Sequence, residues 1–290
     1  MPFTFSILGS GSRGNCTVLC FDDGTQRNLV LLDCGFSIRE TRRRLALHDL
    51  ELEDVSHILL THLDRDHFNP VWINAARRLG ITIHLHHKQR LRAFSSGFSI
   101  GEVDLFDETF NLDLFTSVEA IHFAHDALGT VGFIIEHGDA RLGFATDLGR
   151  VPDHLFDHFR GLHALAFESN YDRRMEMDSE RPIFVKRRVM GGMGHLSNEQ
   201  SLDAVSRIAA QSPLSQIALL HLSQQCNNPR IILDLYRDGA PHLFPFLTVT
   251  NQNHPTPLLG VTARPLPEIE ISPVPQTSES LLRPRPAEHP

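Results

Sequence analysis

A short apolar run at residues 57–61, HILLT, leads directly into the polar segment THLDRDH. A run of this length and composition is typical of a buried strand, and a proline at position 70 then favours the start of a helix. The ligand-type side chains of the polar segment cannot share one face of a helix, so we expect a loop. Imidazole and carboxylate groups suit Zn²⁺, Mn²⁺ or Fe. The alternative is an ordinary polar loop, but the spacing favours a metal site formed by His62, Asp64, Asp66 and His67.

Three further ligand-type residues end later strand-like runs: His125 in HFAHDA, Asp147 in FATDLG and His221 in ALLHLS. Functional sites on sheets gather at the carboxyl ends of strands. Taken singly, each histidine could be a structural residue; as a set, they favour two divalent ions about 3.5–4 Å apart. The expected division is His62, Asp64 and His125 for one ion, Asp66, His67 and His221 for the other, and Asp147 as the bridge.

The order of the remaining segments favours an α/β fold. Strand-like runs come first, a series of β segments follows, and strands then alternate with helices. A sandwich of two mixed β-sheets with helices on the outer faces satisfies this order. Strands are predicted at 3–8, 17–21, 28–33, 57–61, 81–86, 113–123, 131–137, 141–146, 164–168 and 216–221, and helices at about 37–47, 69–79, 152–159, 198–211 and 229–236.

The glycines at positions 9, 11 and 14 fit the dinucleotide-binding pattern G-x-G-x-x-G. That pattern requires a helix immediately after the loop, because the helix N-terminus holds the pyrophosphate. Residues 16–21, CTVLCF, are instead apolar and β-branched and predict a strand. We therefore interpret the glycines as a tight loop between two strands, where they permit positive φ and close backbone approach.

Composition excludes several classes of protein. The net charge of −8 argues against a general nucleic-acid coat, although arginine clusters such as 42–44, 77–78 and 173–174 leave a local basic surface open. No apolar stretch predicts a membrane span and no signal peptide is apparent. The four cysteines form no C-x-x-C pair. Reduced thiols and a cytoplasmic location are the simplest expectation.

The chain is expected to divide after residue 250. Residues 1–250 carry the strand and helix pattern of one α/β domain. Nine of the 17 prolines fall between Pro255 and Pro290, with few aromatic residues. Segments of this composition bury little apolar surface, so residues 251–290 are expected to form a disordered or extended tail.

The motif H-x-D-x-D-H, then a histidine, then TD-x-G, then a strand-end histidine resembles the metallo-β-lactamase fold of metallohydrolases. The resemblance covers about Pro2 to Leu247 and implies an αββα sandwich. Within that fold, LGSGSRGNC, LLDCG, FESNYD, GHLSN and HLS-x-x-C-N look like the YycJ/WalJ-like branch, which is associated with DNA exonuclease activity. The late motifs also look like those of tRNA 3′-processing endonucleases.

The resemblance implies roles for two further residues. A glutamate and a histidine at matching positions serve the resembling nucleases, which makes Glu168 and His195 candidates for the catalytic set together with Asp66. We expect Glu168 to orient His195, which would protonate the leaving alkoxide. The alternative is a structural hydrogen-bonded pair. Asp33, at the end of a strand near the site, is expected to hold the imidazole N–H of a ligand.

One position departs from the family's pattern, since Asp64 stands where a second histidine is usual. An added carboxylate shifts the expected metal toward Mn²⁺ or Fe²⁺ and away from Zn²⁺. The leading hypothesis is a dinuclear-metal-dependent phosphodiester hydrolase, a DNA exonuclease-like nuclease with nucleic acid as its partner. The alternatives are the same fold acting on a small phosphodiester or thioester, which the acidic net charge favours, and a metal-impaired binding protein. The sequence leaves the oligomeric state open.

Overall fold

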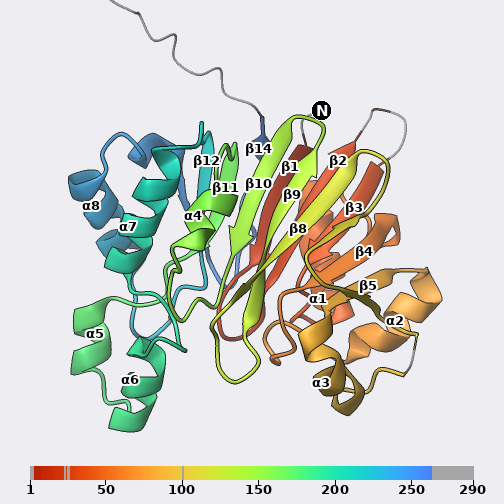
Figure 1. Cartoon of the computed structure of the whole chain (residues 1–290), viewed down its shortest axis with the longest axis horizontal. Helices are drawn as coiled ribbons and strands as arrows, with labels where there is room; N and C mark the ends of the chain where they lie inside the picture. Colours follow the sequence, from red (N-terminus) through yellow and green to blue (C-terminus); the bar gives the residue numbers. More distant parts are fainter. Residues whose placement is uncertain (1–2, 23, 25–26, 100, 263–290) are drawn as a thin grey trace, which may run out of the picture.

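The computed structural model describes residues 3–262 except 23, 25–26 and 100. Two seven-stranded sheets stack face to face, and helices cover their outer faces (Figure 1). The predicted αββα sandwich of two mixed sheets is therefore confirmed. Among the described residues, no helix has the length and apolar character needed to cross a membrane.

The first sheet contains the first six strands of the described chain and one strand near the end of the described residues. Its strands from β14 to β3 pair antiparallel, and those from β3 to β6 pair parallel. The order across the sheet is β14 (Leu259–Val261), β1 (Phe3–Gly9), β2 (Cys16–Asp22), β3 (Arg27–Leu32), β4 (Val55–Leu60), β5 (Thr82–His86) and β6 (Asp104–Phe106).

The second sheet has a similar construction. Its strands from β7 to β10 pair antiparallel, and those from β10 to β13 pair parallel. The parallel strands place their carboxyl ends at one edge of the sandwich. The order across the sheet is β13 (Leu247–Val249), β12 (Gln216–Leu220), β11 (Ala164–Glu168), β10 (Ala140–Ala145), β9 (Thr130–His137), β8 (Thr116–Phe123) and β7 (Thr109–Asn111).

In the described part of the chain, eight α-helices cover the sheets (Figure 1). Local signals mark their ends: Ser197 forms a capping box with Gln200 at the start of α7, and Gly80, with φ 71°, ends α2. Helices α5 and α6 lie at the same end of the sandwich as α3 (Figure 1). The helices are α1 (Ile38–Leu45), α2 (Val71–Leu79), α3 (Arg90–Ser95), α4 (His154–His158), α5 (Arg173–Asp178), α6 (Ile183–Met190), α7 (Asn198–Ala209) and α8 (Pro229–Gly239).

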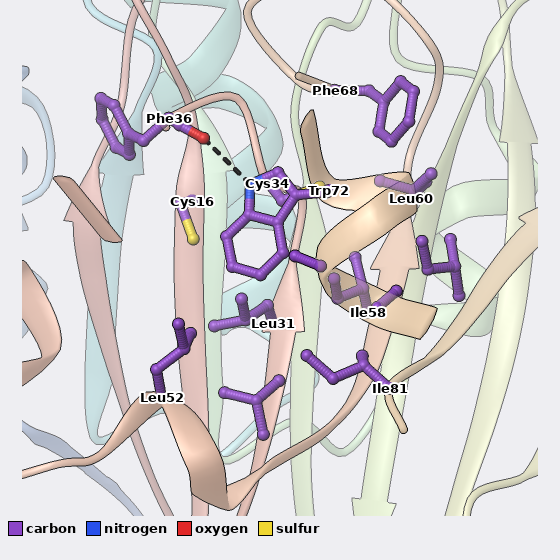
Figure 2. Close-up of a cluster of buried hydrophobic side chains, with 14 of the residues drawn as sticks. Cys16, Leu31, Cys34, Phe36, Leu52, Ile58, Leu60, Phe68, Trp72 and Ile81 are labelled. Atoms are coloured by element: carbon purple, nitrogen blue, oxygen red, sulfur yellow. Dashed lines mark hydrogen bonds between the residues drawn. The ribbon is translucent and has the colours of Figure 1, made fainter. Parts of the chain in front are cut away.

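Apolar side chains fill three layers, one between the sheets and one under the helices on each side. The layer beneath α1 and α2 is organised around Trp72, which is fully buried (Figure 2). Its indole Nε1–H donates a hydrogen bond of 2.9 Å to the carbonyl oxygen of Phe36, so the polar edge of the ring is satisfied inside an apolar layer. This layer anchors the outer side of the strands that lead to the site.

The glycine loop between β1 and β2 adopts the predicted form. Gly11 and Gly14 have φ values of 142° and 141°, and a strand, not a helix, begins at Cys16. The side chain of Asn15 closes the loop by accepting the backbone N–H of Gly11 at 2.7 Å. The dinucleotide-binding pattern therefore lacks the helix that its function requires.

The expected boundary after residue 250 is wrong for the first part of the tail. Residues 259–261 form β14, which pairs with β1, and Gln252 is buried with its Nε2 donating to the carbonyl oxygen of Gly14 at 2.8 Å. Residues 251–262 thus complete the first sheet and support the glycine loop, because pairing with a distant strand satisfies their backbone groups. Residues 263–290 of the expected tail lie outside the described residues.

Candidate metal centre

Seven side chains from segments far apart in sequence meet at the carboxyl-terminal edge of the sandwich. The segment 62–67 follows β4, and the other three residues follow β8, β10 and β12. Six of the seven, all but His67, line a cavity of about 370 Å³ at this edge. All the predicted ligands are thereby brought together: His62, Asp64, Asp66, His67, His125, Asp147 and His221.

The backbone is unusual where strands enter this centre. Asp147 and His221 have φ values of 57° and 55°, and Asp33, behind the centre, has φ 60°. Non-glycine residues rarely adopt this left-handed conformation, which costs of order 1–3 kcal/mol each and concentrates at functional sites. At Asp147 and His221, this turn lets the side chain leave the strand direction and point toward the cavity.

One group of ligand atoms consists of His62, Asp64 and His125, which all lie within 4.8 Å of one another. Nδ1 of His125 donates to the carbonyl oxygen of Gly194 at 3.1 Å, and Nδ1 of His62 lies 2.9 Å from the hydroxyl of Thr61. These contacts hold both rings from outside the cavity. The Nε2 lone pair of each ring is then available to a cation, an arrangement typical of metal-ligating histidines.

A second group consists of Asp66, His67 and His221. Nδ1 of His67 lies 2.6 Å from Oδ2 of Asp33, as predicted for a carboxylate that holds a ligand ring. His221 differs, because both nitrogens of its buried ring face carboxylates: Nδ1 lies 2.8 Å from Oδ1 of Asp147, and Nε2 lies 3.5 Å from Oδ2 of Asp66. A buried imidazole surrounded by carboxylates in this way is typical of a cation site.

Asp147 lies between the two groups. Its Oδ2 is 2.9 Å from Nε2 of His67, and its Oδ1 is 2.8 Å from Nδ1 of His221. Ligand atoms bound to one ion at about 2.1 Å lie roughly 3 Å from each other, so these separations fit a shared coordination sphere. Asp147 also groups with His62 and His67, which suits a residue that contacts both positions.

The centre carries excess negative charge in a buried place. Burial alone would raise the pKa of Asp147, but His221 and His67 outweigh burial and hold it well below its usual range. Conversely, burial would lower the pKa values of His67 and His221, but Asp147 raises both well above the usual range. The buried carboxylates therefore require positive charge beside them. Divalent cations supply that charge, so this donor set fits the metal that the fold implies.

Asp64 has a partner that the sequence did not indicate. Nη2 of Arg92, on α3, donates a hydrogen bond to Oδ1 of Asp64. The other oxygen, Oδ2, lies 3.8 Å from Nε2 of His62, on the cavity side. The helix was not predicted, because six residues are too few to show a clear helical period.

Glu168 and His195 form the predicted pair. Nδ1 of His195 lies 2.7 Å from Oε1 of Glu168, and Oε2 accepts the backbone N–H of Leu148 at 2.7 Å. Glu168 is fully buried, whereas the His195 side chain is 21 % exposed and lines the cavity. His195 lies 3.4 Å from Oδ1 of Asp147, so the pair is positioned directly beside the candidate ligands.

Other polar residues noted in the motifs hold the backbone around His221. The hydroxyl of Ser10 accepts the backbone N–H of His221 at 2.8 Å, and Nδ2 of Asn170 donates to the carbonyl oxygen of His221 at 2.6 Å. Asn227 in turn donates to the carbonyl oxygen of Asn170 at 2.8 Å. These residues position the last ligand, which explains why polar groups follow the final strands.

Helix α6 forms one wall of the cavity through Val185, Arg188 and Val189. Nη2 of Arg188 lies 2.5 Å from Oδ2 of Asp126, which belongs to the loop after β8. This ion pair spans the cavity rim, and the Arg188 side chain is 70 % exposed. An exposed guanidinium at the rim can bind a phosphate group in a bidentate manner.

Comparison with known proteins supports these observations. Residues 28–217 match the model of the beta-lactamase superfamily domain. The chain is 29 % identical over 237 residues to an exodeoxyribonuclease YycJ of Bacillus anthracis, covering 78 % of this chain and 85 % of that protein. It is also 29 % identical over 234 residues to an exodeoxyribonuclease WalJ of Streptococcus pneumoniae serotype 2, covering 78 % and 83 %. Among solved structures, the metallo-beta-lactamase fold protein YhfI of Bacillus subtilis superposes with a TM-score of 0.62 at 14 % identity, covering 88 % of this chain and 99 % of that one.

Proposed function

This chain belongs to the beta-lactamase superfamily and is a metal-dependent hydrolase, and from that premise we propose that it uses two divalent ions to hydrolyse phosphodiester bonds of DNA, as an exonuclease. The observation that carries the proposal is the convergence of seven ligand-type side chains beside the His195–Glu168 pair. The names of the two sequence relatives support DNA as the substrate class.

When bound, divalent ions would activate water and neutralise charge on a phosphodiester. The side chains of the centre fix the positions of the ions. His62, Asp64 and His125 would hold one ion, and Asp66, His67 and His221 the other, with Asp147 contacting both. The native metal is Mn²⁺ or Zn²⁺ in this proposal, with Fe²⁺ as a third candidate, because three carboxylates join four imidazoles in the donor set.

The chain's own residues supply the proton that departure of the alkoxide requires. Nδ1 of His195 contacts Glu168, so its Nε2 is the nitrogen that can carry a proton toward a substrate in the cavity. The buried carboxylate of Glu168 fixes the orientation of the His195 ring, because the backbone N–H of Leu148 holds the second oxygen of that carboxylate. His195 is therefore assigned as the general acid and Glu168 as the residue that positions it.

Arg188, at the cavity rim, would bind a backbone phosphate of the DNA strand that is being hydrolysed. A phosphate can replace Asp126 on the guanidinium without desolvating a buried charge, since the Arg188 side chain is largely exposed. Such contacts are independent of base sequence, which suits an enzyme that degrades DNA from an end.

The test is a nuclease assay on protein stripped with a chelator and then reloaded with Mn²⁺ or Zn²⁺. The substrates are end-labelled single-stranded and double-stranded DNA, and bis(p-nitrophenyl) phosphate is the small phosphodiester. Release of terminal mononucleotides only after reloading supports the proposal. Turnover of the small phosphodiester alone would instead support a small substrate, which the net charge of −8 favours. No turnover of either substrate would reject a phosphodiesterase.

A further inference from the structure

The two oxygens of the Asp64 carboxylate face different surroundings. Oδ2 lies on the side of His62 and the metal centre, whereas Oδ1 accepts a hydrogen bond from Arg92. Asp64 lines the cavity of the centre, and Arg92 lines a separate cavity of about 550 Å³ on the other side. A cation bound through Oδ2 would therefore share this carboxylate with a guanidinium.

The two groups of ligands consequently differ in charge. In the group of His62, Asp64 and His125, the single carboxylate is balanced by Arg92, so its net charge is zero with neutral imidazoles. The other group has Asp66, and Asp147 contacts both positions; within the described part of the chain no arginine or lysine pairs with either of these two carboxylates. Its net charge is therefore more negative.

This charge difference should produce unequal affinities. The affinity of carboxylate sites for divalent cations rises with the number of uncompensated carboxylates, and a fixed positive charge near a cation opposes its binding. The side chains of Arg92 and Asp64 are 37 % and 26 % exposed, so solvent screens this repulsion only in part.

We propose that Arg92 makes the two metal positions unequal. The position formed by Asp66, His67 and His221 takes the first ion, and the position formed by His62, Asp64 and His125 takes the second ion more weakly, with Asp147 contacting both. This inference rests on the two-ion centre of the proposed function. The competing explanation is that Arg92 only orients Asp64, in which case its removal would weaken binding.

The test is a Mn²⁺ titration of the full chain after removal of metal with a chelator, with free Mn²⁺ measured by electron paramagnetic resonance. The variant Arg92→Gln removes the charge and keeps an amide donor for Asp64, whereas Arg92→Lys keeps the charge. Arg90→Gln is the matched control, because it removes an exposed arginine from the same helix. Asp64→Asn identifies the step to which Asp64 contributes.

We expect the unmodified chain to bind two ions in steps that differ at least about tenfold in Kd. Arg92→Gln should tighten the weaker step by about tenfold or more and leave the tighter step unchanged. Arg92→Lys and Arg90→Gln should match the unmodified chain, and Asp64→Asn should lose the weaker step.

The inference is overturned if Arg92→Gln leaves the weaker step unchanged or weakens it, if Arg90→Gln gives the same gain, or if the unmodified chain binds fewer than two ions. The titration contains no nucleic acid, so it is independent of the nuclease assay. Unequal binding that responds to Arg92→Gln, in a protein that cleaves no phosphodiester, would support the inference and reject the proposed function.

Discussion

Oδ2 of Asp33 lies 2.6 Å from Nδ1 of His67, and both side chains are buried. Asp33 also accepts the backbone N–H of Thr61 at 2.8 Å, so the carboxylate is fixed to the strand that carries the ligand loop. The contact places the proton of His67 on Nδ1 and leaves Nε2 for a cation. The orientation of one candidate ligand is thus set by a residue from a different strand.

Asp33→Asn should lower the metal affinity of the position that includes His67 by about 10–100-fold, because an amide has only one acceptor oxygen. It cannot replace both of the carboxylate's contacts, with Nδ1 of His67 and with the hydroxyl of Thr61. Metal titration of the stripped protein measures the change. Because Asp33 is buried, far-UV circular dichroism and thermal unfolding must show that the variant folds. Unchanged affinity in a folded variant would contradict the role assigned to Asp33.

His195→Ala should lower kcat for DNA hydrolysis by about 10²–10⁴-fold while leaving the metal content unchanged, because the ring donates a proton and is not needed as a ligand. Glu168→Gln should have a smaller effect in the same direction. His154→Ala, at an exposed position on α4, is the control. Loss of metal from His195→Ala would reassign the residue to the ligand set.

Gly35→Ala should destabilise the protein by about 1–3 kcal/mol and weaken metal binding, because a Cβ atom at residue 35 would clash with the carbonyl oxygen of Asp66. The backbone of the ligand loop would have to move. Gly192→Ala is the matched control, since a Cβ there would meet no described atom within 4 Å. Chemical denaturation and metal titration measure both effects, and equal behaviour of the two variants would refute the argument.

His84 should make the protein less stable in mild acid. Burial, and then the adjacent His57, lowers the pKa of His84 to about 4 from 6.5. Between these pKa values the unfolded chain binds more protons than the folded chain. The contribution of neutral His84 to the unfolding free energy is therefore complete above pH 6.5 and is lost as the pH falls toward 4. Each pH unit within that window changes the unfolding free energy by about 1.4 kcal/mol at most.

The variant His84→Phe tests this dependence, because phenylalanine retains the stacking on Phe110 but does not titrate. Its unfolding free energy should fall less between pH 6.5 and 4 than that of the unmodified chain. The metal-centre histidines are present in both proteins, so their contribution cancels in the comparison. His154→Phe is the exposed control, and an equal pH slope in all three proteins would exclude His84 as the cause.

Arg188→Ala should weaken binding of single-stranded DNA and reduce the slope of log K against log salt by about 0.7, the value for one phosphate contact. The Arg188 side chain is 70 % exposed and buries little apolar surface, so its removal should leave the fold intact. Arg160→Ala is the control, because Arg160 precedes β11 and lies at the opposite end of that strand from the cavity. Fluorescence anisotropy at several salt concentrations measures the slope, and equal slopes for the two variants would argue against a phosphate contact.

The sequence by itself determined the strand ends and the ligand types. The apolar runs before Thr61 and His221 predict buried strands, and the residues that follow them are the ligand-type side chains of the centre. Period and side-chain chemistry are local properties, so the sandwich and the seven converging residues could be predicted without coordinates. The contact between His195 and Glu168 followed from the resemblance of the late motifs.

Only the tertiary structure decided the partners of these residues. The pairing of Arg92 with Asp64 depends on a short helix without a clear period, and the pairing of β14 with β1 joins residues more than two hundred positions apart. The left-handed backbone at Asp147 likewise leaves no local pattern. Such contacts are fixed by the packing free energy of the whole chain, which offsets local strain and weak local preference, and that free energy is not a property of any short segment.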